Sequence, residues 1–357
     1  MVQIIQLLTA FFLSAFLVYQ SIPIIVRLSN TKKLLDVPNK RKVNKHPIPN
    51  LGGIALFIGI SLSTLLCIYQ MPFADMRYIL AAMIILFFIG MKDDILLIAP
   101  RKKLLAQVIS ALLLIMMGDI RITNLHGIIG MYEIGHLFSL LLSLLIIVGI
   151  TNSINLIDGI DGLAAGLSIF ISGIFGVAFI LFGQPQYAVL SFSITGSLCA
   201  FFIYNVFGKA NKIFMGDTGS LLLGVLFSVL VIKYNEFAIT ASAPIKNYSP
   251  AFSLALLFIP LFDMARVFCV RLFNKKSPFA PDMNHIHHKF LALGYSHIKA
   301  TSIIVALNLL IIAVIYALRS VDINILLALL ILFGIGVPYS PFLSKWIHKG
   351  IRRETIK

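Results

Sequence analysis

The chain has 357 residues, of which 59% are hydrophobic and 12% are charged, and its mean hydropathy is +0.97. Soluble domains are about 45–50% apolar and about 25% charged, so this composition excludes an ordinary water-soluble enzyme and a disordered chain. Eleven helices of ~20 apolar residues, each long enough to cross a bilayer, would use roughly 220 residues, close to the apolar content found. The sequence therefore predicts an all-α, polytopic integral membrane protein, with residues 1–357 forming a single domain.

Apolar segments along the chain predict ten to eleven transmembrane helices. The first segment has no basic n-region and no Ala-x-Ala cleavage site, so we interpret it as a retained span rather than a signal peptide. The sequence shows no internal repeat and no appended soluble domain. The predicted spans are 3–28, 51–70, 77–92, 104–118, 136–153, 162–183, 186–206, 219–233, 250–272, 300–318 and 322–340.

Basic residues fall on one side of these spans, and the net charge is +15. If the N-terminus lies outside, 24 of the 29 Lys and Arg residues lie in cytoplasmic connections or at their edges. This distribution follows the positive-inside rule, so we predict that orientation. In such a protein the basic excess indicates contact with lipid headgroups of the bilayer rather than with nucleic acid.

Carboxylates cluster at the predicted cytoplasmic ends of the spans. An ionisable group in a membrane span costs free energy, so its presence there favours a functional role. Asp93 and Asp94 end one span; they are either a solvated helix end or a like-charged pair that a divalent cation relieves. Asn155, Asp158 and Asp161 recur every three residues, so a helical or turn backbone would place them on one side. Loop capping is the alternative interpretation of this second group.

Two further clusters lie later in the chain. Asp217 is either a helix cap or a carboxylate that, with free N–H groups at a helix start, suits a metal–phosphate pair. The segment 285–288, His-Ile-His-His, favours a phosphate-binding patch with Lys289 over a zinc site, because it lacks Cys or acidic partners in ligand spacing. Asp263 and Arg266, three residues apart, are either an internal ion pair or part of the site. On the outer side, the polar residues His126, Glu133 and His136 are expected to be solvated.

Common nucleotide-binding and zinc-protease motifs do not occur in the sequence. The remaining oxygen ligands and cations favour Mg²⁺, or Mn²⁺, bridging phosphate groups of a substrate. A transporter is the alternative from another functional class. It would have ionisable groups near the middle of the bilayer and internal repeats, and the sequence shows neither feature.

Four motifs in register resemble the polyprenyl-phosphate N-acetylhexosamine-1-phosphate transferases. They are the pair Asp93-Asp94, Asn-x-x-Asn-Leu-Ile-Asp-Gly-Ile-Asp-Gly-Leu-Ala at 152–164, Phe-Met-Gly-Asp-Thr-Gly-Ser at 214–220, and the histidine segment at 285–288. An early motif, Lys-His-Pro-Ile-Pro-Asn-Leu-Gly-Gly at 45–53, matches as well. The resemblance is strongest to the enzymes that use UDP-GlcNAc to begin teichoic acid or O-antigen synthesis. Lys289 stands where the phospho-MurNAc-pentapeptide transferases carry another His, which moves the interpretation away from that sister activity.

The resemblance implies transfer of GlcNAc-1-phosphate from UDP-GlcNAc to undecaprenyl phosphate, with Mg²⁺ or Mn²⁺, on the cytoplasmic face of a bacterial cell membrane. It leaves open whether the protein works as a monomer or as a homodimer, and whether it uses another UDP-N-acetylhexosamine. The implied catalytic residues are Asp93, Asp94, Asp158 and Asp161; the metal ligands are Asn155 and Asp217; and the substrate-binding residues are Lys103, Asp161, His285, His287, His288 and Asn50.

Overall fold

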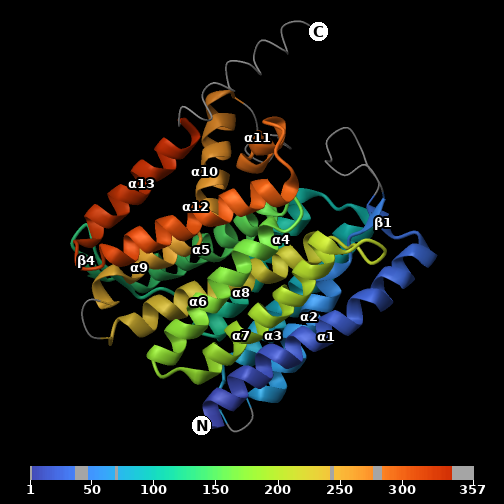
Figure 1. Cartoon of the computed structure of the whole chain (residues 1–357). Coiled ribbons are helices and arrows are strands. Elements are labelled where there is room, and N and C mark those ends of the chain that lie inside the picture. The colour runs from blue at the N-terminus through green and yellow to red at the C-terminus, as the bar shows by residue number, and fades with distance from the viewer. Residues whose placement is uncertain (1, 37–46, 69–70, 242–244, 276–283, 340–357) are drawn as a thin grey trace, which may run out of the picture.

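The computed structural model describes residues 2–36, 47–68, 71–241, 245–275 and 284–339. Outside the described residues lie Lys45 and His46 of the early motif at 45–53, Asp282 beside the histidine segment, and the basic C-terminal tail. The described residues form a bundle of helices with two short antiparallel strand pairs at its ends (Figure 1). The strands are β1 (Leu35–Asp36) with β2 (Ile48–Pro49), and β3 (Asn124–Ile128) with β4 (Met131–Glu133).

The helices follow the predicted segments closely. Six of them are long and apolar enough to cross a membrane, or up to seven if one bent pair counts as a single span. The prediction of a polytopic helical membrane protein is thus confirmed, whereas the division into ten or eleven spans stays a prediction. The helices are α1 (Val2–Lys32), α2 (Gly52–Cys67), α3 (Met76–Leu96), α4 (Pro100–Leu112), α5 (His136–Ile157), α6 (Leu163–Leu181), α7 (Pro185–Phe202), α8 (Gly216–Ala238), α9 (Ile245–Leu256), α10 (Phe258–Phe273), α11 (Ile286–Ala292), α12 (His297–Ala317) and α13 (Ile323–Tyr339), with π-helical continuations of α4 at Leu113–Met117 and of α7 at Ile203–Phe207.

The predicted span 250–272 is broken in the structure. Its two halves, α9 and α10, meet at an angle of 67°, and α10 leaves the direction of the bundle beside α11 (Figure 1). Pro260 has no N–H group to donate to the carbonyl of Leu256, so a continuous helix would lose a hydrogen bond here. The Asn308 side chain satisfies the freed groups, since its Nδ2 donates to Leu256 O at 3.1 Å and its Oδ1 accepts from Ile259 N at 3.1 Å.

Helix α8 lies in the middle of the bundle, and 83% of the residues in its most apolar segment are buried. Its first turns approach α2 and α3 backbone to backbone. A Cβ atom on Gly53 would lie 2.2 Å from Gly219 N, and one on Gly90 would lie 2.6 Å from Thr218 Cα. Small residues allow helices in a bilayer to pack this closely, so these glycines bring the ends of three helices to one place.

The connections between helices sort into two ends of the bundle. At one end, the β3–β4 segment contacts the starts of α13 and α9: Ile129 N donates to Asn324 Oδ1 at 2.8 Å, and His126 Nδ1 lies 2.9 Å from Lys246 O. The expectation of a solvated His126 is wrong, because this contact with the start of α9 buries it to 5% exposure. Glu133 and His136 are exposed, as expected.

Candidate active site

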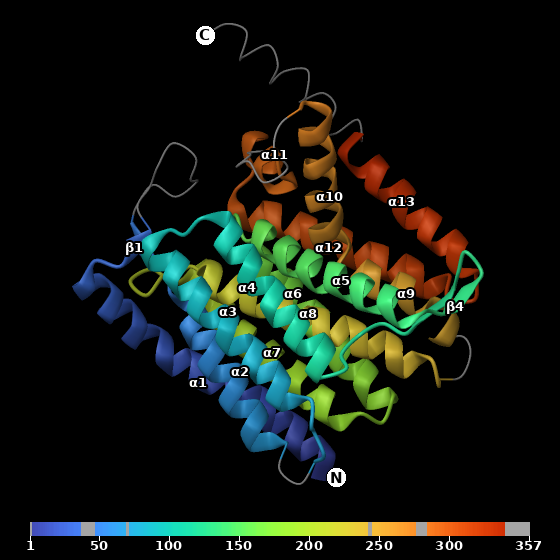
Figure 2. The same cartoon turned by 180° about the vertical axis from the view of Figure 1, so that it is seen from behind.

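Four predicted site residues converge where α3 and α5 end and where α4 and α8 begin (Figure 2). Lys103 Nζ lies 2.6 Å from Asp93 Oδ2 and 2.8 Å from Asp217 Oδ2. Asn155 Nδ2 donates to Asp217 Oδ1 and, at 2.8 Å, to Ser220 Oγ. One ammonium group therefore joins two carboxylates that are far apart in the sequence, and an amide holds the second of them from the other side.

The turn between α3 and α4 directs Lys103 back toward Asp93. Leu97 ends α3 with φ at +51°, a left-handed conformation that reverses the chain, and Ile98 N donates to Asp93 Oδ1 at 2.6 Å. Pro100 then starts α4, where its fixed φ suits the first helical position. Lys103 follows in the first turn of α4, and so the carboxylate and the ammonium meet across a short loop.

Asp94 points away from Asp93 and binds the start of α8. Its Oδ1 accepts from Asp217 N at 2.8 Å, and its Oδ2 accepts from Thr218 N at 3.0 Å and from Thr218 Oγ1 at 2.5 Å. Gly216 permits this approach, because its φ is +71° and a Cβ atom there would lie 2.6 Å from Asp94 Oδ2.

The start of α8 therefore differs from the prediction. Asp217 lies in the first turn and Met215 is at the cap position, so Asp217 is not the cap. The N–H groups of Asp217 and Thr218 are not free for a phosphate, because both donate to the carboxylate of Asp94. The positive end of the helix dipole stabilises such a negative group.

Asn50 reaches the same place through the early motif. Its Nδ2 donates to Asp94 O at 3.2 Å. The backbone that follows pairs with the segment before α8: Gly52 N donates to Phe214 O at 3.0 Å and Gly53 N to Met215 O at 2.9 Å. The early motif at 45–53 and the motif at 214–220 are thus in contact, although about 160 residues separate them in sequence.

Asp161 belongs to a second cluster. Its Oδ2 lies 2.7 Å from Lys212 Nζ and 2.9 Å from His297 Nδ1, and its carbonyl accepts from Thr301 Oγ1 at 2.9 Å. Burial would raise the pKa of Asp161, but the hydrogen bonds from His297 and Lys212 outweigh burial and lower it. The carboxylate therefore ties the loop before α6 to α12 and to the segment before α8.

Asp158 lies between these two clusters. Helix α5 ends at Ile157, so the spacing of three residues does not continue as a helix, and Asn155 and Asp161 contact different partners. Burial, together with the carboxylates of Asp217 and Asp94, raises the pKa of Asp158 to about 7. Asp158 is therefore protonated more readily than an ordinary carboxyl group.

The histidine segment closes the other side of this loop. His285 Nδ1 lies 2.8 Å from Asp263 Oδ2, and a Cβ atom on Gly159 would lie 2.1 Å from His287 Nε2. His287 is 1% exposed, and burial lowers its pKa to about 3, so its imidazole is neutral. His288 follows His287 at the start of α11, their ring centroids 4.2 Å apart.

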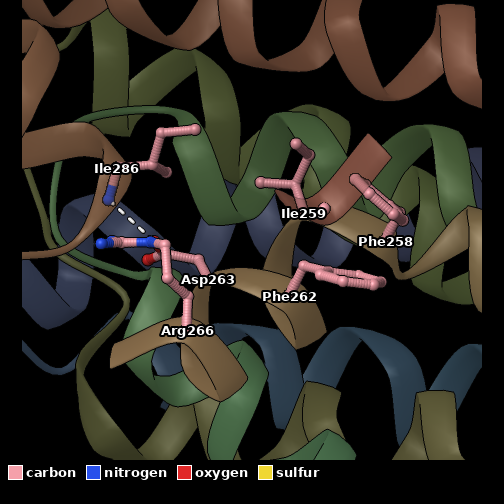
Figure 3. A pocket seen from close by; sticks show the side chains of 7 residues that line it. Phe258, Ile259, Phe262, Asp263, Arg266 and Ile286 are labelled. Atoms are coloured by element: carbon pink, nitrogen blue, oxygen red, sulfur yellow. Dashed lines mark hydrogen bonds and ion pairs between the residues drawn. The ribbon is translucent and has the colours of Figure 1, made fainter. Parts of the chain in front are cut away.

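Asp263 and Arg266 are both an ion pair and part of this region. Arg266 Nη2 lies 2.7 Å from Asp263 Oδ1, which also accepts from Ile286 N at 3.0 Å. Figure 3 shows this pair at one end of an apolar recess lined by Phe258 and Phe262. The broken helix therefore carries a charged pair and an apolar surface next to the histidine segment.

Three side chains that contact site carboxylates were not among the predicted site residues: Lys212, His297 and Thr218. Lys212 and His297 lie 51 and 136 residues from the carboxylate they contact, so no local spacing indicates either pair. Thr218 was inside a motif, and its position directly after Asp217 was a usable signal.

Carboxylates, an amide and an ammonium that converge at one end of a membrane-spanning bundle are typical of integral membrane enzymes that handle phosphate groups. The profile of glycosyl transferase family 4 matches residues 76–235. A relative in Bacillus subtilis (strain 168), a probable undecaprenyl-phosphate N-acetylglucosaminyl 1-phosphate transferase, is 34% identical over 297 residues, which is 83% of this chain and 80% of the relative.

The undecaprenyl-phosphate alpha-N-acetylglucosaminyl 1-phosphate transferase of Escherichia coli (strain K12) is 30% identical over 88% of this chain and 79% of its own length. The enzyme of the same name in Yersinia pestis is 30% identical over 75% of this chain and 72% of its own length. The chain belongs to glycosyl transferase family 4, the family of these sugar-1-phosphate transferases, and the resemblance found in its motifs is confirmed. It is a transferase of the membrane.

Proposed function

We propose that this protein transfers GlcNAc-1-phosphate from UDP-GlcNAc to undecaprenyl phosphate, giving undecaprenyl-diphospho-GlcNAc and UMP. This would be the first membrane step of a cell-wall glycopolymer such as teichoic acid or O-antigen. The observation that carries the proposal is the meeting of Asp93, Lys103, Asn155 and Asp217 at one point. The names of the relatives support the choice of donor sugar and lipid acceptor.

The side chains at this point suit Mg²⁺ or Mn²⁺. Carboxylate and amide oxygens are the ligands that these hard cations prefer, and substrate phosphates usually complete their coordination. The ammonium of Lys103 shows that a cation is stable between Asp93 and Asp217.

The reaction needs charge neutralisation and positioning more than covalent chemistry. An oxygen of the lipid phosphate forms a bond to the β-phosphorus of UDP-GlcNAc, and the bond to the bridging oxygen breaks so that UMP leaves. A bound Mg²⁺ would withdraw charge from the diphosphate. In this scheme Lys103 pairs with a phosphate oxygen, Asn155 fixes the orientation of Asp217, and the neutral imidazole of His287 faces the loop at Gly159.

We assign Asp93 a positioning role rather than general-base catalysis. A phosphate monoester has its second pKa near 6, so at neutral pH the acceptor is mostly dianionic and needs little deprotonation. Asp93 is also held on both oxygens, by Ile98 N and by Lys103. If the reaction of an Asp93→Asn variant recovers as the pH rises well above 7, the base role stands; a phospho-sugar bound covalently to Asp93 would establish a two-step displacement.

The site should face the cytoplasm of a bacterial cell. UDP-sugars are cytosolic, and the orientation that the positive-inside rule favours puts every motif on that side. Cysteine residues placed singly near Lys102 and near Tyr132 would test this, because an impermeant thiol reagent added to intact cells should label only the second.

The decisive experiment is UMP release by the purified protein with a panel of UDP-sugars, with and without undecaprenyl phosphate and Mg²⁺. We expect release with UDP-GlcNAc only when both are present, and loss of release with a chelator. Preference for UDP-MurNAc-pentapeptide or another UDP-N-acetylhexosamine would replace the proposed donor. Release that does not need the lipid would contradict the transfer itself.

A further inference from the structure

In the carboxylates of Asp93 and Asp217, the two oxygen atoms have different kinds of partner. Asp93 Oδ1 accepts from Ile98 N at 2.6 Å, and Asp217 Oδ1 accepts from Asn155 Nδ2. These donors belong to the backbone and to an amide at the end of α5, so they are fixed by the fold. The two Oδ2 atoms instead share one partner, the ammonium of Lys103, at 2.6 and 2.8 Å.

The partner on the Oδ2 side can leave without a change in the backbone. Lys103 carries its charge on a flexible four-carbon stem, and its ammonium is a compact point charge with three donors. Its side chain is 18% exposed, so it borders open space, whereas that of Asp93 is 8% exposed. If the ammonium moved out, the Oδ1 contacts would keep both carboxylates in place.

The charge around these atoms favours a second cation. Asp93, Asp94 and Asp217 are three carboxylates in contact through one network, and Lys103 is the one cation paired with them among the described residues. Asp94 is occupied by the start of α8, which leaves the two Oδ2 atoms as the place where charge can be exchanged.

We propose that Lys103 is an exchangeable internal cation, which competes with the divalent cation of the proposed reaction for Oδ2 of Asp93 and of Asp217. Lys103 stabilises the carboxylates until the divalent ion takes over this contact, and the released ammonium then pairs with a phosphate oxygen of the substrates. The exchange keeps the total charge of the site within narrow limits while an anionic donor and an anionic acceptor approach. This inference rests on the proposed function for the identity of the ion, but its test does not use the reaction.

The test measures Mn²⁺ affinity of the purified full-length protein from the signal of free Mn²⁺ in electron paramagnetic resonance. Charge-assisted hydrogen bonds are strong enough that removing the competitor in Lys103→Met should tighten Mn²⁺ binding by about tenfold or more. Lys102→Met is the matched control, because Lys102 is its exposed neighbour and loses the same charge; we expect a change of less than about twofold by screening. Unchanged or weaker binding by Lys103→Met would overturn the proposal.

A second measurement separates competition from general electrostatics and remains available if Lys103→Met folds poorly. In Lys103→Ala, added methylammonium should weaken Mn²⁺ binding, because it brings back an ammonium group with N–H donors. Tetramethylammonium at equal concentration has no such donors and should leave the affinity unchanged. Equal effects of the two ions would show that Lys103 acts only through its charge, which contradicts the proposal. A protein that passes these tests but releases no UMP would refute the proposed function and leave the exchange standing.

Discussion

The two ends of the bundle treat their charged residues differently. At the end that carries β3 and β4, the two partly buried acids, Asp75 and Glu236, each have close partners. Lys233 Nζ lies 2.7 Å from Asp75 Oδ2, which also accepts from the Tyr187 hydroxyl. Glu236 accepts from Thr123 N and from Thr123 Oγ1, both at 2.7 Å. These contacts join the ends of α3, α7 and α8 and the segment before β3, and both acids have their oxygens occupied by the protein itself.

At the other end the carboxylates outnumber their cations. Asp93 and Asp217 share Lys103, Asp94 binds the start of α8, and the Asp158 side chain makes no hydrogen bond or ion pair with any residue that the structure describes. Excess negative charge costs stability, and a protein keeps it where a cation or a reaction requires it. Variants at the end with excess carboxylates should therefore change the activity, whereas variants at the end with β3 and β4 should change the stability.

The largest effect is expected for Asp217→Asn. The variant keeps the size of the side chain but removes one of the two carboxylates that hold Lys103, and with it a proposed ligand of the divalent ion. UMP release should fall by about 10²–10³-fold, the usual loss when a group that stabilises transition-state charge is removed. The unfolding temperature should stay close to that of the wild type, because one charge of a repelling group is gone. More than a tenth of the wild-type rate would contradict this role.

Asp94→Asn should lower both the rate of UMP release and the unfolding temperature. The neutral amide loses the charge that stabilises the start of α8, where Asp94 accepts three hydrogen bonds from Asp217 and Thr218. Hydrogen bonds to a charged group are worth about 1.5–3 kcal/mol, so the unfolding temperature should fall together with a loss of activity of about 10–100-fold. A loss of activity with unchanged thermal unfolding would instead place Asp94 among the residues that touch substrate.

The sequence could predict the helical membrane fold, and it singled out side chains that the structure brings together, but it could not predict how these side chains pair. The length of the apolar segments predicted the helices because the thickness of the bilayer sets it. The break at Pro260 needed knowledge of Asn308, which lies in another helix. Asp93 and Asp94 are adjacent in the sequence and identical in kind, and only the tertiary structure shows that one binds Lys103 while the other binds the start of α8.

A smaller effect is expected for Gln107→Leu, which would test how Lys103 is positioned. Gln107 is 2% exposed and exchanges hydrogen bonds with Asn152, at 2.7 and 3.3 Å. This pair joins α4 to α5 one turn beyond Lys103 and one turn before Asn155. Leucine has a similar size but leaves the Asn152 amide without this partner, so α4 should shift and kcat should fall by about tenfold.

A double variant provides the control for this pair. Gln107→Leu combined with Asn152→Leu removes both polar groups, so part of the lost stability should return, because a buried pair replaced by apolar groups costs less than a broken one. The kcat should remain low, since the link between the two helices is still missing. Full recovery of kcat would show that Gln107 affects the site only through stability.

The smallest effect on the reaction is expected at the end with β3 and β4, from Lys233→Met. The side chains of Lys233 and Asp75 are 15% and 25% exposed, so the variant leaves a partly buried carboxylate without its cation. The free energy of unfolding should fall by about 1–3 kcal/mol, while UMP release per folded molecule should stay within about twofold of the wild type. Replacing both residues, as Asp75→Leu with Lys233→Met, should restore part of the stability because no charge is left alone. If Lys233→Met reduced the rate as strongly as Gln107→Leu, the two ends would be coupled through α8, and the separation between a structural end and a chemical end would be wrong.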